Sequence, residues 1–288
     1  MKILGTGLTG LVGSRLVELL GDKYEFENLS RSTGVDIVNK ENVLEKIKSS
    51  DAQIVLHMAA KTDVDGCEKD KTLGEAGEAW KINVEGTRNV ADACLETNKK
   101  LIYISTDFVF DGEKNIYVED DIPNPINWYG ATKYEGEKIV KVLETPWIIA
   151  RIAYPYRANF PKVDFARAIL KRLKEGFPVM AVVDHIFTPT LIDDIALGIE
   201  DLIQNNGNGI FHVVGSQSLS PYDACFTIAK EFNLDDSRIA EVTRTEFFNN
   251  RACRPFQLAL KNDRIAKLGI KMHTFEEGIR EIKKQMFH

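Results

Sequence analysis

A tyrosine and a lysine that could act together on a proton stand four residues apart, at Tyr129 and Lys133. This spacing places both side chains on the same face of a helix. A phenol normally loses its proton near pH ~10, so it exchanges protons near neutrality only where a positive charge stabilises the phenolate. The ammonium of Lys133 would supply such a charge. The pair therefore predicts acid–base chemistry at the beginning of a helix.

Hydroxyl and carboxyl groups precede this pair in the run Ser105-Thr106-Asp107. The run follows a short apolar segment, at the expected carboxyl end of a strand, where α/β sheets place their chemistry. A hydroxyl from Thr106, or from Ser105, could hydrogen-bond a substrate carbonyl and polarise it. Together with the tyrosine and the lysine, this run predicts a carbonyl-reducing or alcohol-oxidising site.

Three glycines spaced as GxxGxxG, Gly7, Gly10 and Gly13, lie between an expected strand and its helix. In this context they allow a tight turn, close approach to a pyrophosphate and close packing of helix on strand. The helix amino terminus adds free N–H groups and a positive dipole end. We therefore expect a dinucleotide here, bound also by Thr9, Leu11 and Val12, with Lys133 holding its ribose hydroxyls; the alternative is a tight turn without a ligand.

The end of the second expected strand distinguishes the two nicotinamide cofactors. An acidic residue there binds the ribose 2′-hydroxyl of NAD, whereas an arginine accommodates the 2′-phosphate of NADP. Ser30 and Arg31 occupy this position, so NADP(H) is favoured. Glu27 would be the acid if the strand ended earlier, so NAD(H) also stays open, as does a solvated surface role for Arg31.

Three other positions have competing interpretations. Asn83 on an expected long helix would be unremarkable if it stood alone, and His57 is as consistent with a buried core histidine as with a functional one. Asp193 and its acidic neighbour are expected to begin a helix, where carboxylates favour the dipole, rather than to bind a metal.

Alternating apolar strands and amphipathic helices run through the first half of the chain. This order predicts a Rossmann-like, doubly wound parallel sheet, because parallel strands need crossover helices. Residues 1–151 should form the dinucleotide-binding domain, and residues 152–288 mainly a substrate-binding region that exchanges elements with it. The expected strands are 2–6, 24–30, 53–57, 101–105 and 147–151, and the expected helices are 11–20, 41–48, 76–96 and 128–143.

Composition narrows the class of protein. The 288 residues carry a formal net charge of −6, which opposes a nucleic-acid surface. The four cysteines form no CxxC pair, the histidines lack metal-ligand spacing, and no apolar run has transmembrane length. We expect a cytoplasmic protein without a metal site, a disulfide framework or a membrane partner; a homodimer is the commonest assembly for such a protein.

The motifs resemble, in the same order, those of the extended short-chain dehydrogenase/reductase family, and within it the dTDP-4-dehydrorhamnose reductases. The most specific run is S-T-D-F-V-F-D-G at 105–112, which is similar to S-T-D-Y-V-F-D-G in those reductases. Supporting matches are Thr62-Asp63-Val64-Asp65 after Ala59-Ala60, Asn83-Val84-Glu85-Gly86-Thr87, Pro189-Thr190 and Arg254-Pro255.

The resemblance implies a role for each matched residue. Tyr129 would donate the proton, Lys133 would be its electrostatic partner and Thr106 would polarise the carbonyl, while hydride passes from NAD(P)H to the C4 ketone of a dTDP-linked 6-deoxy-4-hexulose. Further cofactor contacts would come from Asp36, Ile37, Ala59, Ala60, Lys61, Asn83 and Ser105. Substrate contacts would come from Thr62, Val64, Thr106, Asp107, Phe108, Tyr154 and Arg254.

Two departures from the family pattern affect the substrate more than the chemistry. Phe108 replaces a tyrosine, and the segment 151–156 differs from the usual R-T-S-W-V-Y. A nucleotide-sugar epimerase or dehydratase with tightly held NAD is one alternative, although Phe108 stands where a dehydratase would need an added base. A non-catalytic regulatory subunit, like the β subunit of methionine adenosyltransferase, is the other.

Overall fold

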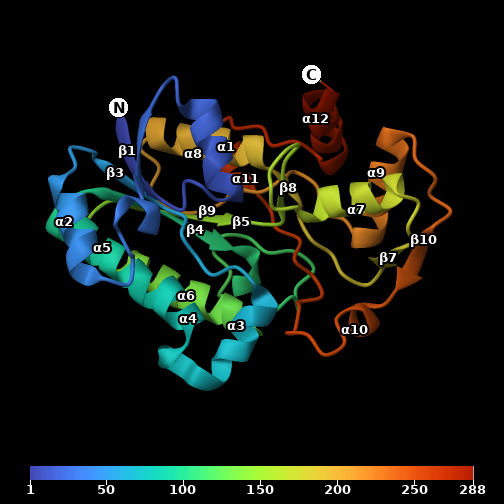
Figure 1. Cartoon of the computed structure of the whole chain (residues 1–288), viewed down its shortest axis with the longest axis horizontal. Helices are drawn as coiled ribbons and strands as arrows, with labels where there is room; N and C mark the ends of the chain where they lie inside the picture. The colour runs from blue at the N-terminus through green and yellow to red at the C-terminus, as the bar shows by residue number, and fades with distance from the viewer. Residues whose placement is uncertain (288) are drawn as a thin grey trace.

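The computed structural model describes residues 1–287, and its centre is a six-stranded parallel sheet in the order β2-β1-β3-β4-β5-β9 (Figure 1). Every neighbouring pair in this sheet is parallel. This arrangement confirms the expected Rossmann-like class. The strands are β1 (Lys2–Thr6), β2 (Glu25–Leu29), β3 (Ile54–His57), β4 (Lys100–Thr106), β5 (Trp147–Ile152) and β9 (Gly209–His212).

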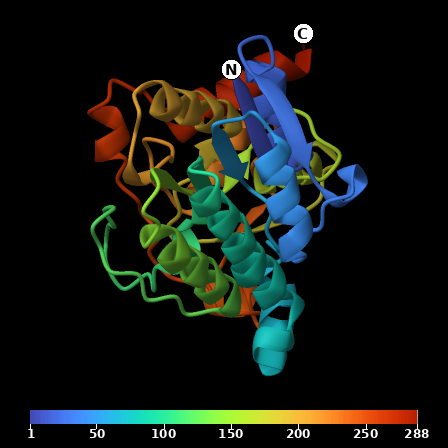
Figure 2. The same cartoon turned by 90° about the vertical axis from the view of Figure 1, so that its left-hand side faces the viewer.

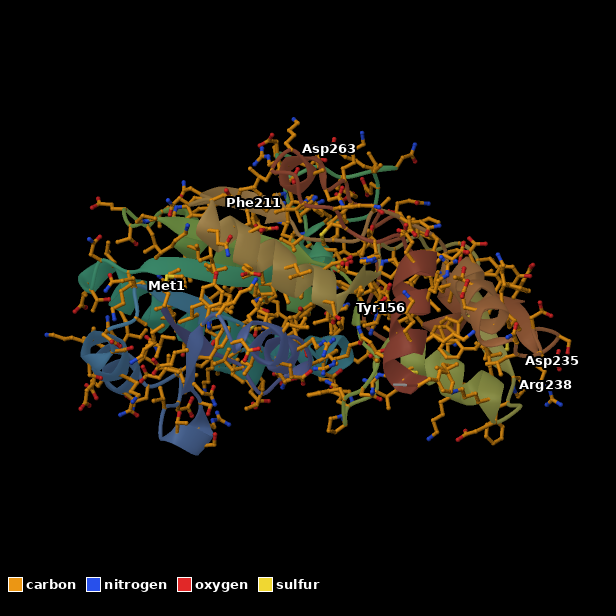
Figure 3. The ribbon with its side chains drawn as sticks, turned by 90° about the horizontal axis from the view of Figure 1, so that it is seen from above. Met1, Tyr156, Phe211, Asp235, Arg238 and Asp263 are labelled. Atoms are coloured by element: carbon orange, nitrogen blue, oxygen red, sulfur yellow. The ribbon has the colours of Figure 1, made fainter. Side chains whose placement is uncertain are left out.

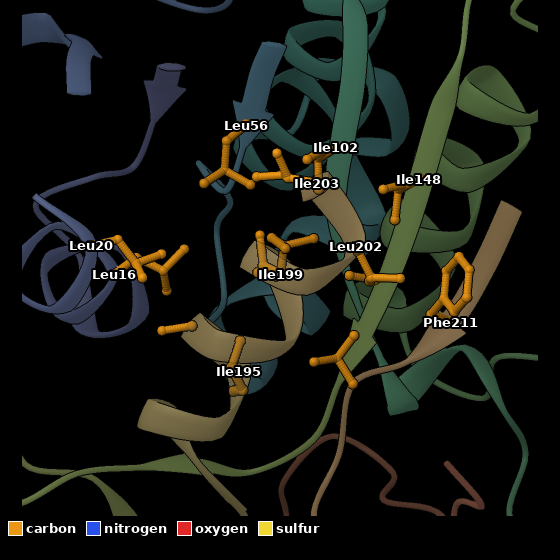
Figure 4. Packing of buried hydrophobic residues seen from close by; sticks show 14 of the residues in the cluster. Leu16, Leu20, Leu56, Ile102, Ile148, Ile195, Ile199, Leu202, Ile203 and Phe211 are labelled. Atoms are coloured by element: carbon orange, nitrogen blue, oxygen red, sulfur yellow. The ribbon is translucent and has the colours of Figure 1, made fainter. Parts of the chain in front are cut away.

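Helices cover both faces of the sheet, because successive strand residues point to opposite sides (Figures 1 and 2). Ile3 packs with the helices α1 (Leu11–Leu20) and α8 (Ile192–Gln204), whereas its neighbour Leu4 packs on the other side. Figure 4 shows Leu16, Ile195 and Ile199 in the first of these two cores. The helices of the second face are α2 (Lys40–Ser49), α5 (Gly86–Glu96) and α6 (Trp128–Lys141).

One expected helix, 76–96, is divided. A 3₁₀ segment, Lys71–Ala76, ends at Gly77, which is extended with φ −71° and ψ 152°, so the helical run begins only at α4 (Glu78–Trp80). A π-helical turn (Lys81–Glu85) then leads into α5. The other expected elements match the structure to within two residues at each end. The expected helix 76–96 is therefore found from Glu78 to Glu96, two residues shorter because Gly77 is extended, and with a π-helical turn within it.

A smaller region lies beyond the carboxyl edge of the sheet and has its own core around Tyr156, Phe187 and Phe275. In Figure 3, Asp235 and Arg238 mark its far end, opposite Met1. Two short parallel sheets order it, β6 (Pro155–Tyr156) with β8 (Thr190–Leu191), and β7 (Val179–Val182) with β10 (Ile239–Val242). Its helices are α7 (Phe165–Lys174), α9 (Pro221–Phe232), α10 (Arg244–Phe247) and α12 (Phe275–Phe287).

The chain returns to the large sheet after first leaving it. Helix α8 and strand β9 come from the second half of the sequence, yet α8 covers one face of the sheet and β9 pairs with β5. Asp193 and Asp194 lie in the first turn of α8, as expected. Within residues 1–287, no helix is both long and apolar enough to cross a membrane.

Candidate active site

In the glycine turn between β1 and α1, backbone segments approach each other too closely for side chains at Gly7 and Gly13. Gly7 has a φ of 71°, and a Cβ built there would lie 2.8 Å from the amide nitrogen of Ala59. At Gly13, a Cβ would lie 2.7 Å from the Cα of Leu8. Gly10 is the N-cap of α1, and no side chain caps this helix end. The free N–H groups and the space that side chains would fill suit the pyrophosphate of a dinucleotide.

Thr6 fixes the end of β3 beside this turn. Its Oγ1 accepts hydrogen bonds from the amides of Met58 (3.1 Å) and Ala59 (3.0 Å) and donates to Nδ1 of His57 (2.7 Å). The other nitrogen of His57 lies 3.0 Å from Oγ1 of Thr87. Burial lowers the pKa of His57 to about 3, so the ring is neutral. Of its two interpretations, the structure supports the buried core histidine.

Asn83, in the π-helical turn, is fully buried and ties this loop to α6. Its Oδ1 accepts from the amide of Lys61 (2.8 Å), and its Nδ2 donates to the carbonyl oxygen of Lys61 (3.1 Å) and to Oγ1 of Thr132 (3.0 Å). Thr132 in turn donates to the carbonyl oxygen of Tyr129 (2.9 Å). Asn83 is therefore not a solvated helix residue. It connects the loop after β3 with the first turn of α6.

Tyr129 and Lys133 lie on the buried face of α6, as the spacing predicts. Asn127 caps this helix by accepting from the amide of Gly130 (2.9 Å). The ammonium of Lys133 donates to the carbonyl oxygen of Ile104 in β4 (2.7 Å) and lies 4.0 Å from the centre of the Tyr103 ring. Burial lowers the pKa of Lys133 to about 7.

The phenol of Tyr129 is protonated in this structure. Burial raises its pKa, and the nearby hydroxyl of Thr106 opposes the rise only in part. The ammonium of Lys133 is hydrogen-bonded to Ile104, so it would stabilise a phenolate at Tyr129 by its charge and not through a hydrogen bond. A buried phenol that keeps its proton is suited to donate it when negative charge develops on a neighbouring oxygen.

Thr106 and Asp107 lie where β4 ends and form a small polar cluster. Oγ1 of Thr106 donates to Oδ1 of Asp107 (2.9 Å) and accepts from the amide of Phe108 (3.2 Å). The second carboxyl oxygen of Asp107 is buried without a hydrogen-bond partner among the described residues. Burial raises the pKa of Asp107 to about 7. This oxygen could therefore bind a hydroxyl group of a substrate.

The residues expected to choose the cofactor lie on the surface after β2. Nε of Arg31 pairs with Oδ2 of Asp36 at 3.0 Å, and Ser30 caps the 3₁₀ turn Arg31–Thr33. Ile37 is buried beneath α5, so its side chain is part of the core. Arg31 is 71% exposed in its side chain and can turn toward a phosphate.

Among the expected substrate residues, the two aromatic side chains pack together beside Tyr129. Phe108 lies 5.8 Å from Tyr129 and 6.2 Å from Tyr154, between ring centres. Tyr154 has a φ of 40°, an unusual backbone conformation for a tyrosine. Its hydroxyl donates to Nε2 of His185 (3.2 Å), because Nδ1 of His185 must donate to the carbonyl oxygen of Pro255 (2.8 Å).

The remaining expected residues lie around this centre. Arg254 pairs with Asp65 at 2.5 Å, at the start of α3 (Val64–Asp70), instead of pointing freely toward a ligand. Nζ of Lys61 pairs with Asp70 (3.0 Å) and Glu78 (2.5 Å), so its ammonium is already neutralised by two carboxylates. Thr62 and Thr9 are exposed, Leu11, Val12 and Ala60 are partly exposed, and Val64 packs against the core near Phe108.

The model of one protein family, described as the RmlD substrate binding domain, matches residues 1–287. The chain belongs to the RmlD substrate binding domain family. A dTDP-4-dehydrorhamnose reductase from Aggregatibacter actinomycetemcomitans is 30% identical over 299 residues, covering 98% of each chain. A methionine adenosyltransferase 2 subunit beta from Bos taurus is also 30% identical, covering 97% of this chain and 86% of that protein.

Solved structures agree with this membership of the RmlD family. The crystal structure of a dTDP-4-dehydrorhamnose reductase from Bacillus anthracis, in complex with NADP, superposes with a TM-score of 0.90 at 31% identity, covering 99% of each chain. A UDP-glucose 4-epimerase from Thermus thermophilus, at 21% identity and a TM-score of 0.82, shows the shared fold alone. The predicted resemblance to the extended short-chain dehydrogenases and the predicted fold are confirmed.

Several residues of this RmlD-family site were not predicted from the sequence. Glu137 and Arg151 form a fully buried ion pair beneath Ser105, and His185 holds Tyr154. Only Glu137 had a signal, since it follows Lys133 by one helical turn and must lie on the same face. The pairing of Arg151 and the contact of His185 depend on tertiary structure and have no local pattern.

Proposed function

We propose that this protein reduces the C4 ketone of a dTDP-linked 6-deoxy-4-hexulose, with hydride from NADPH and a proton from Tyr129. The RmlD family places the chain among NAD(P)-dependent oxidoreductases, as its sequence predicts. The observation that carries the proposal is the convergence of Thr106, Tyr129 and Lys133 at the end of β4, beside a glycine turn without a cap.

The glycine turn and Arg31 would hold the cofactor. The N–H groups at the start of α1 suit the pyrophosphate, and the exposed guanidinium of Arg31 suits a 2′-phosphate, so NADP(H) is favoured over NAD(H). The reduced nicotinamide supplies the hydride when it is bound. A relative of known structure was crystallised in complex with NADP, which supports this preference.

The chain's own residues would bind and protonate the substrate. A carboxyl oxygen of Asp107 that is buried and has no hydrogen-bond partner among the described residues would bind a sugar hydroxyl, and Thr106 lies beside it to polarise the ketone. As the alkoxide develops, Tyr129 gives up its phenolic proton, while the ammonium of Lys133 stabilises the phenolate that forms. Phe108, Tyr154 and Arg254 would border the nucleotide sugar.

Turnover of both cofactors with dTDP-6-deoxy-L-lyxo-4-hexulose tests this function. We expect NADPH to be consumed faster than NADH, and Tyr129→Phe to lower kcat by at least about a hundredfold, the usual contribution of general acid catalysis. Substrate-dependent consumption that survives Tyr129→Phe would contradict the role of the phenol. Cofactor binding without turnover would contradict the proposed substrate.

A regulatory subunit is a second candidate, because relatives named methionine adenosyltransferase 2 subunit beta are as similar as the reductases. Such a role predicts a stable complex with a second, different chain and no turnover by the isolated protein. The native mass of the purified protein distinguishes this complex from the homodimer predicted above. The intact set of Thr106, Tyr129 and Lys133 supports the reductase.

A further inference from the structure

The ion pair between Glu137 and Arg151 lies directly beneath the catalytic end of β4, and neither side chain is exposed. Nε and Nη2 of Arg151 donate to the two oxygens of Glu137 at 2.8 and 2.7 Å. This is a bidentate contact, which fixes orientation as well as distance. The pair thus holds one residue of α6 and one residue of β5 in a single geometry.

A third element joins this pair. Oγ of Ser105, in β4, donates to Oε1 of Glu137 at 2.7 Å. Ser105 immediately precedes Thr106, and Glu137 follows Lys133 by one turn of α6. The ion pair therefore links the strand end that carries Thr106 to the helix that carries Tyr129 and Lys133.

The far side of Arg151 is also constrained. Its guanidinium lies 4.9 Å from the centre of the Phe110 ring, and Nη1 lies 3.4 Å from Nε2 of His212. Nδ1 of His212 donates to the carbonyl oxygen of Lys261 (2.9 Å), so Nε2 is the acceptor for Arg151. Burial lowers the pKa of His212 to about 3, which keeps this acceptor neutral.

Stability alone is a weak reason for such a pair. Two buried charges lose their hydration, and well-packed apolar residues in their place are often equally or more stabilising. What an apolar pair could not provide is the hydrogen bond to Ser105 and a negative charge near Lys133. Both of these act on the groups proposed to carry the chemistry.

The charge of Glu137 bears on Lys133. Burial lowers the pKa of Lys133 to about 7, and the Glu137 carboxylate opposes this lowering. The other titratable or charged groups on the elements around the ammonium are His57 on β3, Tyr103 on β4, Asp107 after β4, Tyr129 on α6 and Arg151 on β5. His57 is neutral, both tyrosines are protonated and Arg151 is positive. Asp107 is the other acid, but burial raises its pKa to about 7, and its charge acts on Tyr129. Glu137 is therefore the carboxylate whose charge raises the pKa of Lys133.

We propose that Glu137 is a positioning residue for the reductase reaction, acting through Ser105 on the end of β4 and through α6 on Lys133. This role rests on the function proposed above. Glu137 is fully buried and bonded to Arg151 and Ser105, so it would act through these residues and not by direct contact with substrate or cofactor. It sets the distance between Thr106 and the Tyr129–Lys133 pair, and it favours the charged form of the ammonium.

The test compares Glu137→Gln, Glu137→Asp and Ser105→Ala. We expect Glu137→Gln to lower kcat by about tenfold, with the KM for NADPH changed by less than about twofold. Its loss of activity at alkaline pH should begin about one pH unit lower, since Lys133 loses its proton more easily without the carboxylate. Glu137→Asp keeps the charge and should restore this alkaline limit. Ser105→Ala removes one hydrogen bond and should lower kcat without moving the limit.

Glu200→Gln is the matched control. Glu200 is a buried carboxylate on α8, paired with Lys23 at 2.9 Å on the other face of the sheet. This variant should change the melting temperature but neither kcat nor the alkaline limit. NMR titration of Lys133 in 13C-lysine-labelled wild type and Glu137→Gln measures the change in the pKa of Lys133 directly. It needs no turnover and therefore does not depend on the substrate.

Three outcomes would overturn the role of Glu137. One is a Glu137→Gln variant with wild-type kcat and pH profile and only a lower melting temperature. The second is an unchanged Lys133 titration in that variant. If Glu137→Gln does not fold, wild-type kcat in Ser105→Ala overturns the role. Absent turnover in the wild type would instead contradict the proposed reductase, and the positioning role with it.

Discussion

The ammonium of Lys133 donates a 2.7 Å hydrogen bond to the carbonyl oxygen of Ile104, two residues before the strand ends at Thr106. A lysine on a helix is thus attached to the neighbouring strand rather than to a carboxylate. Because a carbonyl compensates for lost hydration less well than an anion, the charged form is costly here. The cost of this charge to the stability of the fold can be measured.

Lys133→Met should abolish reductase activity yet stabilise the fold. The folded-state pKa of about 7 lies below the unfolded value, so the unfolded chain binds more protons between these two values. The free energy of unfolding of the wild type should therefore rise with pH through this window, by about 1.4 kcal/mol per unit at most. Urea unfolding at pH 7 and pH 9 checks this, with Lys133→Met as the variant whose rise should be smaller. Equal rises in both proteins would contradict a depressed pKa.

His57 and His212 should make the fold sensitive to acid. Burial lowers the pKa of both to about 3, so both are neutral when folded but become protonated in the unfolded chain below about pH 6.5. Their contribution to stability is present above that pH and is lost as the pH falls. Each should contribute a slope of about 1.4 kcal/mol per pH unit.

Unfolding by urea at pH 7, 6 and 5 measures this slope for the wild type and for His212→Gln. The slope for His212→Gln should be smaller by the contribution of one proton, about 1.4 kcal/mol per pH unit. A slope that His212→Gln leaves intact would show that His212 is protonated in the folded protein.

Gly7→Ala should weaken cofactor binding more than a simple backbone penalty explains. A Cβ at Gly7 meets the backbone of Ala59 at 2.8 Å, so the two loops must separate. Gly269 is the matched control, with a φ of 85° and nothing within 4 Å of an added Cβ. Both substitutions cost about 1 kcal/mol in conformation, but only Gly7→Ala should raise the Kd for NADPH, by about tenfold or more. Equal effects on Kd would place the cofactor elsewhere.

Arg31→Ala should remove the preference for NADPH. The guanidinium is exposed and, within residues 1–287, paired only with Asp36, and a surface ion pair of this kind holds it with less than about 1 kcal/mol. We expect the KM for NADPH to rise about tenfold, with the KM for NADH nearly unchanged. Lys40→Ala, on the exposed start of α2, is the charge-matched control. A similar rise for both cofactors would point to a damaged turn rather than a lost phosphate contact.

Sequence patterns predicted the parts of the site that depend on local geometry. The spacing of Tyr129 and Lys133 defines a helix face, and the glycines define a turn, so both were located correctly without tertiary information. Asn83 was harder, since the π-helical turn that buries it has no distinctive sequence signal. The pairs Arg254–Asp65 and Arg151–Glu137 join segments that are far apart in sequence, and nothing local indicates them.

The late return of the chain to its large sheet affects how the protein is made. Strand β9 pairs with β5, and α8 covers the face that contains Ile3 and Leu16. On a ribosome, α1 alone covers that face until residue 204 has left the exit tunnel, and the outer edge of β5 has no partner until residue 212 has done so. A gene cut after residue 151 would encode a sheet that lacks α8 on one face and β9 at one edge, so we expect the first half to fold poorly as an independent cassette.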